Sequence, residues 1–491
     1  MNCLFPTFTK NNILYRLHDG KQHGLSQEVV NEIIESDIKL VIMPDASSND
    51  YDLHKQLKEH DIDVLVIDHH EADKVSEYAC VINNQLCDYP TKSLSGVGMV
   101  YKFCSYIDEL KESNYANDFI DLVATGLIAD MMDLRDFETR YLITEGLKNI
   151  RNPFLKEICK VQNYQIEKHD GLNPYTVGFY IAPLVNAVTR VGTQAEKLLL
   201  FQSMIDYKGY EQIPSTKRGC SGQFETRVEQ ACRVIKNVKN RQTKTQDEIL
   251  AMVEHMIKEE KLLRNKILVI CLDQNIDPNL TGLIANQVAA KYQHPTLLLN
   301  DKDELWSGSG RNFAYSPLSD FRSFCNETGL IEFAQGHASA FGFAIRKENL
   351  DEFIDKTNNI LYDEDFQTTY DVDFIWTTED LSGYNIFELA RGQWIWGQEI
   401  SKPLVAIENI KVHPQDIQLM KGTTLKISLP NGVNLIKFGS SEEEYDSLYS
   451  EMGYVTITMV GECKENVWNG IRTPQIEVKD FEITDVEEYY F

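Results

Sequence analysis

The feature that most constrains this chain is a short apolar run that ends in one acid and two histidines. Val64–Ile67 is unbroken and mostly β-branched, which predicts a strand buried on both faces of a parallel sheet. Asp68, His69 and His70 follow it directly. Because ligands in open α/β sheets collect at the carboxyl ends of strands, we expect a functional site there. A carboxylate and two imidazoles suit Mn²⁺, Mg²⁺ or Zn²⁺, and ordinary surface residues at a strand end are the alternative.

A second predicted strand also ends in a carboxylate. Leu40–Pro44 is apolar and is followed directly by Asp45. Other elements expected around these strands are helices at residues 27–35 and 52–60 and strands at residues 12–17 and 79–82. Strands that alternate with helices predict a parallel sheet with right-handed crossovers. We therefore expect two neighbouring strand ends that both carry carboxylates.

The composition predicts a soluble globular chain with several domains. Its 491 residues correspond to roughly two to four domains. No apolar run approaches the roughly 20 residues that span a bilayer, and the first residues lack the pattern of a signal peptide. The ten cysteines form no CxxC pair, which predicts reduced thiols in a cytosolic protein and argues against a structural zinc site.

The charge pattern limits the kinds of partner. A net charge of −27 argues against broad, nonspecific binding to nucleic acid. It leaves room for a local basic groove, because residues 217–244 contain eight basic residues and two acids. This basic segment is either a solvated helix face or a surface that follows phosphates, and the residues alone leave both interpretations open.

A glycine turn follows the first sheet. Ser95 and Gly96 open a predicted helix at residues 99–107. The free N–H groups at such a helix start can hold a phosphate, although tight helix packing explains the glycines as well. Further along, Asn186 and Arg190 place an amide and a guanidinium in an apolar stretch.

One acid lies in an apolar helix. Asp130 falls within a predicted helical segment at residues 122–134. A buried carboxylate is costly unless it has a partner. A metal ion is one candidate partner, and Arg140 is the other.

The second half of the chain begins with long polar helices at residues 223–263, which we expect to connect two domains. A new α/β unit follows, with strands at residues 266–270 and 296–299 around a helix at residues 281–292. Two glycine-rich loops are expected next, at residues 306–311 and 335–342. Small residues together with an arginine and a histidine suit close approach to a phosphodiester.

The last part of the chain changes to short strands separated by turn signals. The expected strands lie at residues 404–410, 424–429, 455–460 and 475–478. Such spacing predicts a small β-barrel. Residues 485–491 form an acidic tail that we expect to be mobile or to serve as a docking element.

Taken in order, these segments resemble the DHH phosphoesterase family, and within it the RecJ-like single-strand-specific exonucleases of phage or prophage type. Asp68–His70 is similar to the namesake motif, Pro44–Ser47 to the second motif and Ser95–Gly98 to the glycine turn. Ala124–Asp130, together with Arg140, resembles the fourth motif. The remaining matches are Asn186 and Arg190 with a RecJ-type segment, Gly308, Ser309, Arg311, Gly336, His337 and Gly342 with loops of the DHH-associated domain, and residues 466–480 with the closing strands of the RecJ OB-fold.

The resemblance implies an α/β fold with four parts. A doubly wound parallel-sheet DHH domain, N-terminally incomplete, would occupy residues 1–215, and a helical connector residues 216–264. A second α/β domain, the DHH-associated substrate-binding domain, would occupy residues 265–363. An OB-like nucleic-acid-binding β-barrel with the acidic tail would form residues 364–491.

The resemblance also implies a site that uses two Mn²⁺ or Mg²⁺ ions. Asp45 would bridge the ions, His69 and Asp130 would complete the protein ligands of one ion, and Asp68 and His70 would orient the site and the phosphate. The residues that would bind substrate are Ser95, Gly96, Asn186, Arg190, Gly308, Ser309, Arg311, Gly336 and His337.

The chain departs from the family pattern at its start and in one loop. The family opens with a strand and helix that carry an Asp-x-Asp-type motif, and Met1 falls after that unit, so the other ion would lack most of its protein ligands. Asp19 lies in a different place and is not assigned to the missing role. Gln335 stands where the family usually has glycine.

Three functions therefore remain open. The first is hydrolysis of single-stranded DNA from 5′ to 3′ in recombination, repair or replication. The second is a DNA-binding or replication scaffold with a disabled centre. The third is one part of a split exonuclease, with another polypeptide supplying the missing unit; a single-strand-binding protein is a further expected partner. A phosphodiesterase of small nucleotides is disfavoured, because those enzymes lack the C-terminal β domain.

Overall fold

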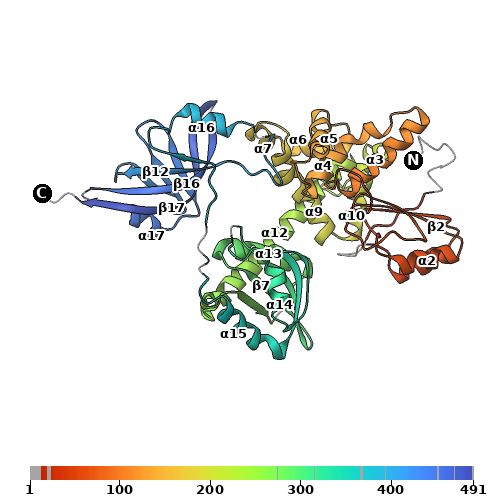
Figure 1. Cartoon of the computed structure of the whole chain (residues 1–491). Helices are drawn as coiled ribbons and strands as arrows, with labels where there is room; N and C mark the ends of the chain where they lie inside the picture. Colours follow the sequence, from red (N-terminus) through yellow and green to blue (C-terminus); the bar gives the residue numbers. More distant parts are fainter. Residues whose placement is uncertain are drawn as a thin grey trace.

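The computed structural model describes the parts of the chain at residues 13–18, 24–273, 275–314, 316–364, 366, 369–392, 394–449, 453–468 and 470–488. Figure 1 shows three regions along it: an N-terminal region in red to yellow, a second α/β region in green and a C-terminal β region in blue. Asp19 and residues 489–491 lie outside the described residues. No helix in the described part is both long and apolar enough to cross a membrane.

The N-terminal region contains the expected parallel sheet. Its strand order is β1 (Leu40–Pro44), β2 (Asp63–Asp68) and β3 (Cys80–Asn83); α1 (Gln27–Ile34) precedes β1, and α2 (Tyr51–Glu59) connects β1 with β2. The predictions of these strands and helices are confirmed, with boundaries that differ by one or two residues.

Both faces of β2 are covered, as the unbroken apolar run predicts. Val64 and Val66 pack with Leu57 of α2 in one core. Ile67 packs in a second core with Leu127, on the side of the sheet that the later helices cover. Each fully buried side chain of this kind contributes about 2 kcal/mol of hydrophobic stabilisation. The strand ends are therefore held rigidly, which suits them to position a site.

The predicted strand at residues 12–17 is wrong for the part that the structure describes, since residues 13–18 form no strand. Tyr15 packs its ring against Phe201 and accepts a hydrogen bond from the side chain of Gln202. Apolar alternation favours a strand only where a neighbouring strand offers partners. Here the segment contacts a helix instead.

Helices form the rest of the N-terminal region. They are α3 (Gly96–Lys111), α4 (Ile120–Ala129), α5 (Phe137–Lys148), α6 (Pro153–Val161), α7 (Asn163–Lys168), α8 (Pro174–Thr176), α9 (Ala182–Val191), α10 (Gln194–Met204) and α11 (Asp206–Gly209), with a π-helical turn at Val177–Ile181. The helix expected at residues 122–134 ends earlier, at Ala129, and Asp130 is its C-cap residue. Asp130 therefore lies at the end of a helix rather than inside one.

One long helix joins the first two regions. It is α12 (Arg227–Glu259), preceded by the hairpin of β4 (Gln212–Pro214) and β5 (Phe224–Thr226). Val228 and Ile235 near its start belong to a core of the N-terminal region. Val253 and Ile257 near its end belong to a core of the second region. The helix is thus packed at both ends, in the position that the sequence predicted for a connector.

The second region is a mixed sheet of order β6 (Leu268–Leu272), β7 (Thr296–Lys302), β8 (Leu305–Arg311), β10 (Ala340–Arg346) and β9 (Ile331–His337). Its helices are α13 (Pro278–Tyr292), α14 (Phe321–Glu327) and α15 (Leu350–Ile360). The two segments predicted as glycine-rich loops are therefore strands, and the second forms a hairpin. A side-chain carbon on Gly308 would lie 2.0 Å from the Leu298 carbonyl oxygen, so the glycine permits close strand contact rather than a loop.

The C-terminal region is a seven-stranded sheet that follows the predicted series of strands. Its order is β11 (Phe374–Trp376), β12 (Leu404–Val412), β16 (Gly453–Trp468), β17 (Ile471–Glu488), β15 (Asn434–Phe438), β14 (Thr424–Ser428) and β13 (Ile417–Met420), with α16 (Gly383–Ala390) and α17 (Glu442–Leu448). The acidic tail was predicted to be mobile or a docking element, and mobility is wrong for residues 485–488, while docking stays a prediction. Those residues extend β17, where Glu487 pairs with Tyr454 and accepts its hydroxyl hydrogen bond.

Candidate metal centre and nucleic-acid cavities

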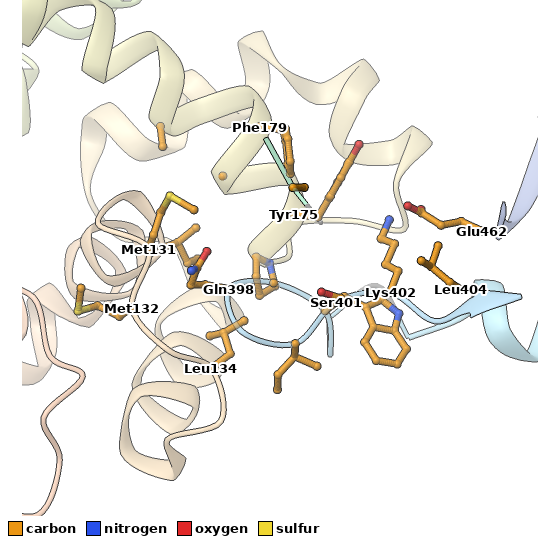
Figure 2. Close-up of a pocket in the computed structure, with 18 of the residues that line it drawn as sticks. Met131, Met132, Leu134, Tyr175, Phe179, Gln398, Ser401, Lys402, Leu404 and Glu462 are labelled. Atoms are coloured by element: carbon orange, nitrogen blue, oxygen red, sulfur yellow. The ribbon is translucent and has the colours of Figure 1, made fainter. Parts of the chain in front are cut away.

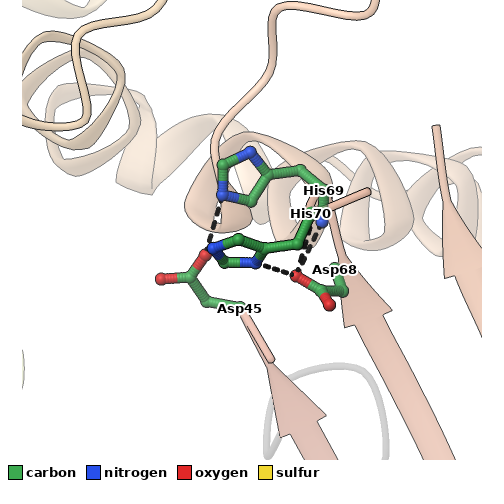
Figure 3. A group of neighbouring side chains, drawn as sticks. All are labelled: Asp45, Asp68, His69 and His70. Carbon is green, nitrogen blue, oxygen red and sulfur yellow. Dashed lines mark hydrogen bonds and ion pairs between the residues drawn. The ribbon is translucent and has the colours of Figure 1, made fainter. Parts of the chain in front are cut away.

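Two neighbouring strand ends bring together the carboxylates and histidines predicted from the sequence. β1 and β2 are parallel, with Pro44 opposite Ile67, so Asp45 and Asp68 leave the same edge of the sheet. Asp45, Asp68, His69 and His70 each offer a ligand atom, and these atoms all lie within 4.8 Å of one another. Figure 3 shows the four side chains converging above the two strands. The prediction that neighbouring strand ends bring carboxylates together is confirmed, and the role of this cluster as a metal site stays a prediction.

Asp45 is held in an unusual backbone conformation. Its φ is 64°, in the left-handed region that residues other than glycine rarely adopt. The Asp45 N–H donates to the Ile67 carbonyl at 2.8 Å, which ties this turn to β2. The first residue of α3, Gly96, lies against the carboxylate, and a side-chain carbon there would be 2.2 Å from Asp45 Oδ1. The glycine therefore leaves the space that Asp45 occupies.

His69 is the point on which two carboxylates converge. Its Nε2 lies 3.1 Å from Asp45 Oδ1 and 3.3 Å from Asp130 Oδ2. The Asp130 side chain is 49% exposed, so it does not carry the cost of a fully buried carboxylate. The Arg140 guanidinium donates to the backbone carbonyls of Leu134 and Ile395. The three residues predicted as metal ligands thus face one another.

Asp68 is buried and organises the two histidines that follow it. Its carboxylate accepts from Ser48 Oγ at 2.7 Å, from His70 Nδ1 at 2.7 Å and from the His69 N–H at 2.8 Å. Burial alone would raise the pKa of Asp68, but the hydrogen bonds from His70, Ser48 and His69 outweigh it and hold that pKa well below its usual range. The same hydrogen bond raises the pKa of His70 against the effect of its own burial.

The donor set fits a divalent cation. Carboxylate oxygens and one imidazole nitrogen are the ligands that Mn²⁺ and Mg²⁺ accept in proteins. Asp45 and Asp130 each place a carboxylate oxygen within 3.3 Å of His69 Nε2, and Asp68 supports His70 in the way that outer partners orient metal-site histidines. No cysteine belongs to this cluster in the part of the chain that is described.

A large cavity lies next to this centre, where the N-terminal helices, the linker before β12 and the strands β16 and β17 meet. Its volume is about 860 Å³. Figure 2 shows Tyr175 and Phe179 projecting toward it, with Lys402 nearby. Trp396 adds a third aromatic ring to the lining, and Asn186, predicted to bind substrate, lies on its wall. Lys402 Nζ stands 4.3 Å from the Tyr175 ring centre, a cation–π arrangement.

Three of the predicted substrate residues in the second region line a smaller cavity of about 260 Å³. Gly308, Ser309 and Arg311 belong to β8 there, and the Ser309 hydroxyl hydrogen-bonds to Thr281 at 2.8 Å. Burial lowers the pKa of Arg311, and the nearby charge of Arg190 lowers it further. The charge of Arg190 on α9 thus acts on Arg311 of β8, although Arg190 is not among the described residues that line this cavity.

The other predicted substrate residues are placed differently. Gly336 and His337 end β9, and they do not line that cavity among the described residues. Ser95 is the N-cap residue of α3 beside Gly96, and its hydroxyl is buried with no hydrogen-bond partner in the described structure. Close packing explains Gly96, which makes room for Asp45, and phosphate binding at this helix start stays a prediction.

Most of the basic side chains at residues 217–244 form ion pairs. Glu225 is 4% exposed at its side chain and binds both Lys217 and Arg233. The other pairs join Arg227 with Glu211, Arg241 with Glu196 and Lys244 with Glu248. These contacts favour the interpretation as a structural and solvated helix face over a surface that follows phosphates.

Two groups at this site were not predicted from the sequence. Ser48 and Asn83 form a hydrogen-bonded chain with Asp68, with 2.9 Å between Asn83 Nδ2 and Ser48 Oγ. A linker segment at residues 395–402 packs on the loop after Asp130, as the Leu134 N–H donates to the Gln398 carbonyl at 3.2 Å. The aromatic run around Trp396, which lies outside every predicted strand, was the one sign that the linker is packed rather than free.

Comparisons with known proteins agree with this geometry. Residues 7–127 match the N-terminal domain of the DHH family, and residues 372–480 match the RecJ OB domain. A putative SPbeta prophage-derived single-strand DNA-specific exonuclease, YorK of Bacillus subtilis (strain 168), is 36% identical over 99% of this chain and 85% of its own length. The chain belongs to the DHH family, among the RecJ-like proteins.

Other RecJ proteins are more distant relatives of this DHH family member. The single-stranded-DNA-specific exonuclease RecJ of Bacillus subtilis is 26% identical over 94% of this chain, which spans 56% of that relative. The crystal structure of RecJ in complex with Mn²⁺ from Thermus thermophilus superposes with a TM-score of 0.70 at 18% identity. That match covers 94% of this chain and 64% of the RecJ chain. The structural likeness supports the fold, and the α/β architecture with a C-terminal OB-type region is confirmed.

Proposed function

We propose that this DHH family protein is a metal-dependent exonuclease that hydrolyses single-stranded DNA from 5′ to 3′. The observation that carries the proposal is the convergence of Asp45 and Asp130 on His69 at the carboxyl ends of two parallel strands. The relatives YorK and RecJ are named as single-strand-DNA-specific exonucleases, which supports the choice of substrate.

Asp45, His69 and Asp130 would hold a Mn²⁺ or Mg²⁺ ion. When bound, divalent ions supply a nucleophilic water and neutralise the charge that develops on a phosphodiester during in-line displacement. Asp68 keeps the His70 ring fixed by the 2.7 Å hydrogen bond to Nδ1. The same carboxylate holds the backbone of His69, so one buried acid orients both histidines toward the substrate.

The cavities suit a single strand better than a duplex. Aromatic rings stack on unpaired bases, and each base contributes about 1–3 kcal/mol in such sites. Tyr175, Phe179 and Trp396 provide rings in the large cavity. Arg190 and Arg311 would bind phosphates, for which guanidinium groups have the matching geometry. The net charge of −27 limits attraction of duplex DNA to the rest of the surface.

The test is hydrolysis of a labelled single-stranded oligonucleotide with Mn²⁺ by the unmodified chain and by Asp45→Asn. We expect the substitution to reduce the rate about 100-fold or more, because changes to outer partners of a metal site already cost about 10–100-fold. Asp63→Asn is the matched control. Asp63 lies at the opposite end of β2, is 72% exposed and pairs with Lys58, so its loss should leave the rate unchanged.

Two results would contradict the proposal. The first is equal activity of the chain and of Asp45→Asn. The second is binding of single-stranded DNA by the unmodified chain without any hydrolysis, which would support the scaffold instead. Labels at the 5′ and 3′ ends of parallel substrates report the polarity, since a 5′-to-3′ enzyme releases the 5′ label first.

A further inference from the structure

A second cavity adjoins the metal centre. Its volume is about 560 Å³, and its lining includes His69, Lys92, Arg135 and Glu399. Met131 lines both this cavity and the large aromatic one, so the two spaces are neighbours. A DNA strand that places one phosphate at His69 would therefore pass a second phosphate along this wall.

Arg135 is a cation in the lining of this cavity, and its guanidinium binds a side chain rather than backbone carbonyls. Its Nε and Nη2 donate to the two oxygens of Asp133, at 3.0 and 2.7 Å, which fixes the plane of the guanidinium. Its side chain is 63% exposed. The Lys92 ammonium, by contrast, donates to the carbonyls of Asn84 and Cys87.

Glu399 stands opposite Arg135, beyond hydrogen-bond distance of the guanidinium. Its carboxylate lies 3.6 Å from Arg135 Nη2, which is an ion pair longer than a normal hydrogen bond. The linker that carries Glu399 is anchored nearby, because Leu134 donates to the Gln398 carbonyl at 3.2 Å. The Gln398 side chain also donates to Glu399 Oε1 at 3.0 Å. The acid is thus held over the cavity by its own linker and contacts Arg135 only loosely.

We propose that Arg135 binds a phosphate adjacent to the scissile one, and that Glu399 occupies the same guanidinium edge until DNA displaces it. The inference rests on the proposed function. A guanidinium binds phosphate through two parallel N–H groups, and Asp133 presents Arg135 in a fixed orientation for this contact. Glu399 competes with the phosphate because both are anions. Arg135 is a positioning residue, which raises the affinity for the strand without touching the reacting atoms.

The experiment measures binding of a fluorescein-labelled single-stranded oligonucleotide in EDTA over a series of salt concentrations, beside hydrolysis with Mn²⁺. We expect Arg135→Ala to weaken binding several-fold and to reduce the slope of log Kd against log salt by about one, as for one lost phosphate contact. KM should rise more than kcat falls. Glu399→Gln should strengthen binding about two- to fivefold, the range of a solvent-exposed ion pair. In the Arg135→Ala background, Glu399→Gln should have no effect.

Arg151→Ala is the matched control, since Arg151 is a 50% exposed arginine paired with Asp118 outside these cavities. Wild-type behaviour of Arg135→Ala, or an equal loss in both arginine variants, would overturn the inference. A higher Mn²⁺ requirement in Glu399→Gln would assign Glu399 to the metal and would also overturn it. These failures leave the effect of Asp45→Asn intact, whereas absence of hydrolysis by the unmodified chain would contradict the proposed function itself.

Discussion

The backbone of Asp45 and its contact with Gly96 determine the shape of the metal centre. Asp45 has a φ of 64° and Ser47 has a φ of 84°, so the turn after β1 is left-handed at two residues other than glycine. Such conformations cost roughly 1–3 kcal/mol each and persist where surrounding contacts hold them. The Asp45 N–H bond to Ile67 and the space above Gly96 are two such contacts.

Gly96→Ala tests the second contact. A side-chain carbon at this position would lie 2.2–2.4 Å from three atoms of Asp45, so the carboxylate must move away from His69. We expect hydrolysis of single-stranded DNA to fall about 100-fold, because misplacement by about 1 Å costs this much in a positioned site. Gly98→Ala is the control in the same helix, since its nearest contacts are Leu127 and Leu94 side-chain atoms at 3.3–3.4 Å. A Gly96→Ala protein as active as the control would refute the role of this contact.

Among individual residues, the sequence predicted those that belong to a local pattern. Asp45, Asp68 and His69 follow apolar strands directly, so the strand-end rule found them. Arg135 and Glu399 were missed because they lie far apart in the sequence and no periodicity connects them. Their contact depends on how the linker packs, and local propensity carries no information about it.

Among the elements, α12 and the hairpin before it are joined by a buried charge. The Glu225 side chain is 4% exposed and accepts from Arg233 at 2.5 Å and from Gln230 at 3.0 Å. Burial alone would raise the pKa of Glu225, but hydrogen bonds from Gln230, Lys217, Ser215 and Arg233 outweigh it and lower the pKa from 4.5 to about 2. The ionised carboxylate therefore stabilises the folded state.

Glu225→Gln should show this effect as a change in the pH dependence of stability. Because the folded pKa is lowered, the contribution is complete above pH 4.5 and is lost as the pH falls toward about 2. We expect the variant to be less stable by roughly 2 kcal/mol at pH 7 and to lose less stability on acidification. Urea unfolding at pH 7 and at pH 3 measures both. Glu211→Gln, which removes an ion pair from a 47% exposed carboxylate, should change neither value by much.

Element types were predicted where composition clearly favoured one type, and they were missed where glycine dominated. The strand of Val64–Ile67 was found from its unbroken, β-branched apolar run, and α12 from a long polar segment without any strand pattern. The segments around Gly308 and Gly336 form strands, because neighbouring strands of the same sheet approach their backbones closely. A single sequence cannot distinguish a glycine that permits such contact from one that forms a loop.

Residues of the N-terminal region, the linker before β12 and the C-terminal sheet all line the large cavity. Among its lining residues, Lys402 has a pKa that burial lowers strongly. The residue lies on the linker, beside Tyr175 of the N-terminal region and the charged strands of the C-terminal sheet. Burial lowers the pKa of Lys402 from 10.5 to about 8, and the charge of Lys464 adds to this effect, against the attraction of Glu462 and Glu477. Burial raises the pKa of Tyr175 to about 12, so Tyr175 stays neutral near pH 8.

If the cavity holds single-stranded DNA, its affinity should fall as the pH rises through 8. Lys402 is mostly charged at pH 7 and mostly neutral at pH 9, so a charge-assisted contact to phosphate is lost, which corresponds to roughly tenfold in Kd. The free energy of unfolding should instead increase with pH. Because the pKa of Lys402 is lower in the folded than in the unfolded chain, the folded state gains stability between pH 8 and 10.5. Lys402→Met should bind weakly and equally at both pH values, whereas Lys244→Met, a control at an 80% exposed lysine, should keep the wild-type dependence. Equal affinity of the unmodified chain at pH 7 and pH 9, measured at constant ionic strength, would show that Lys402 does not contact the strand.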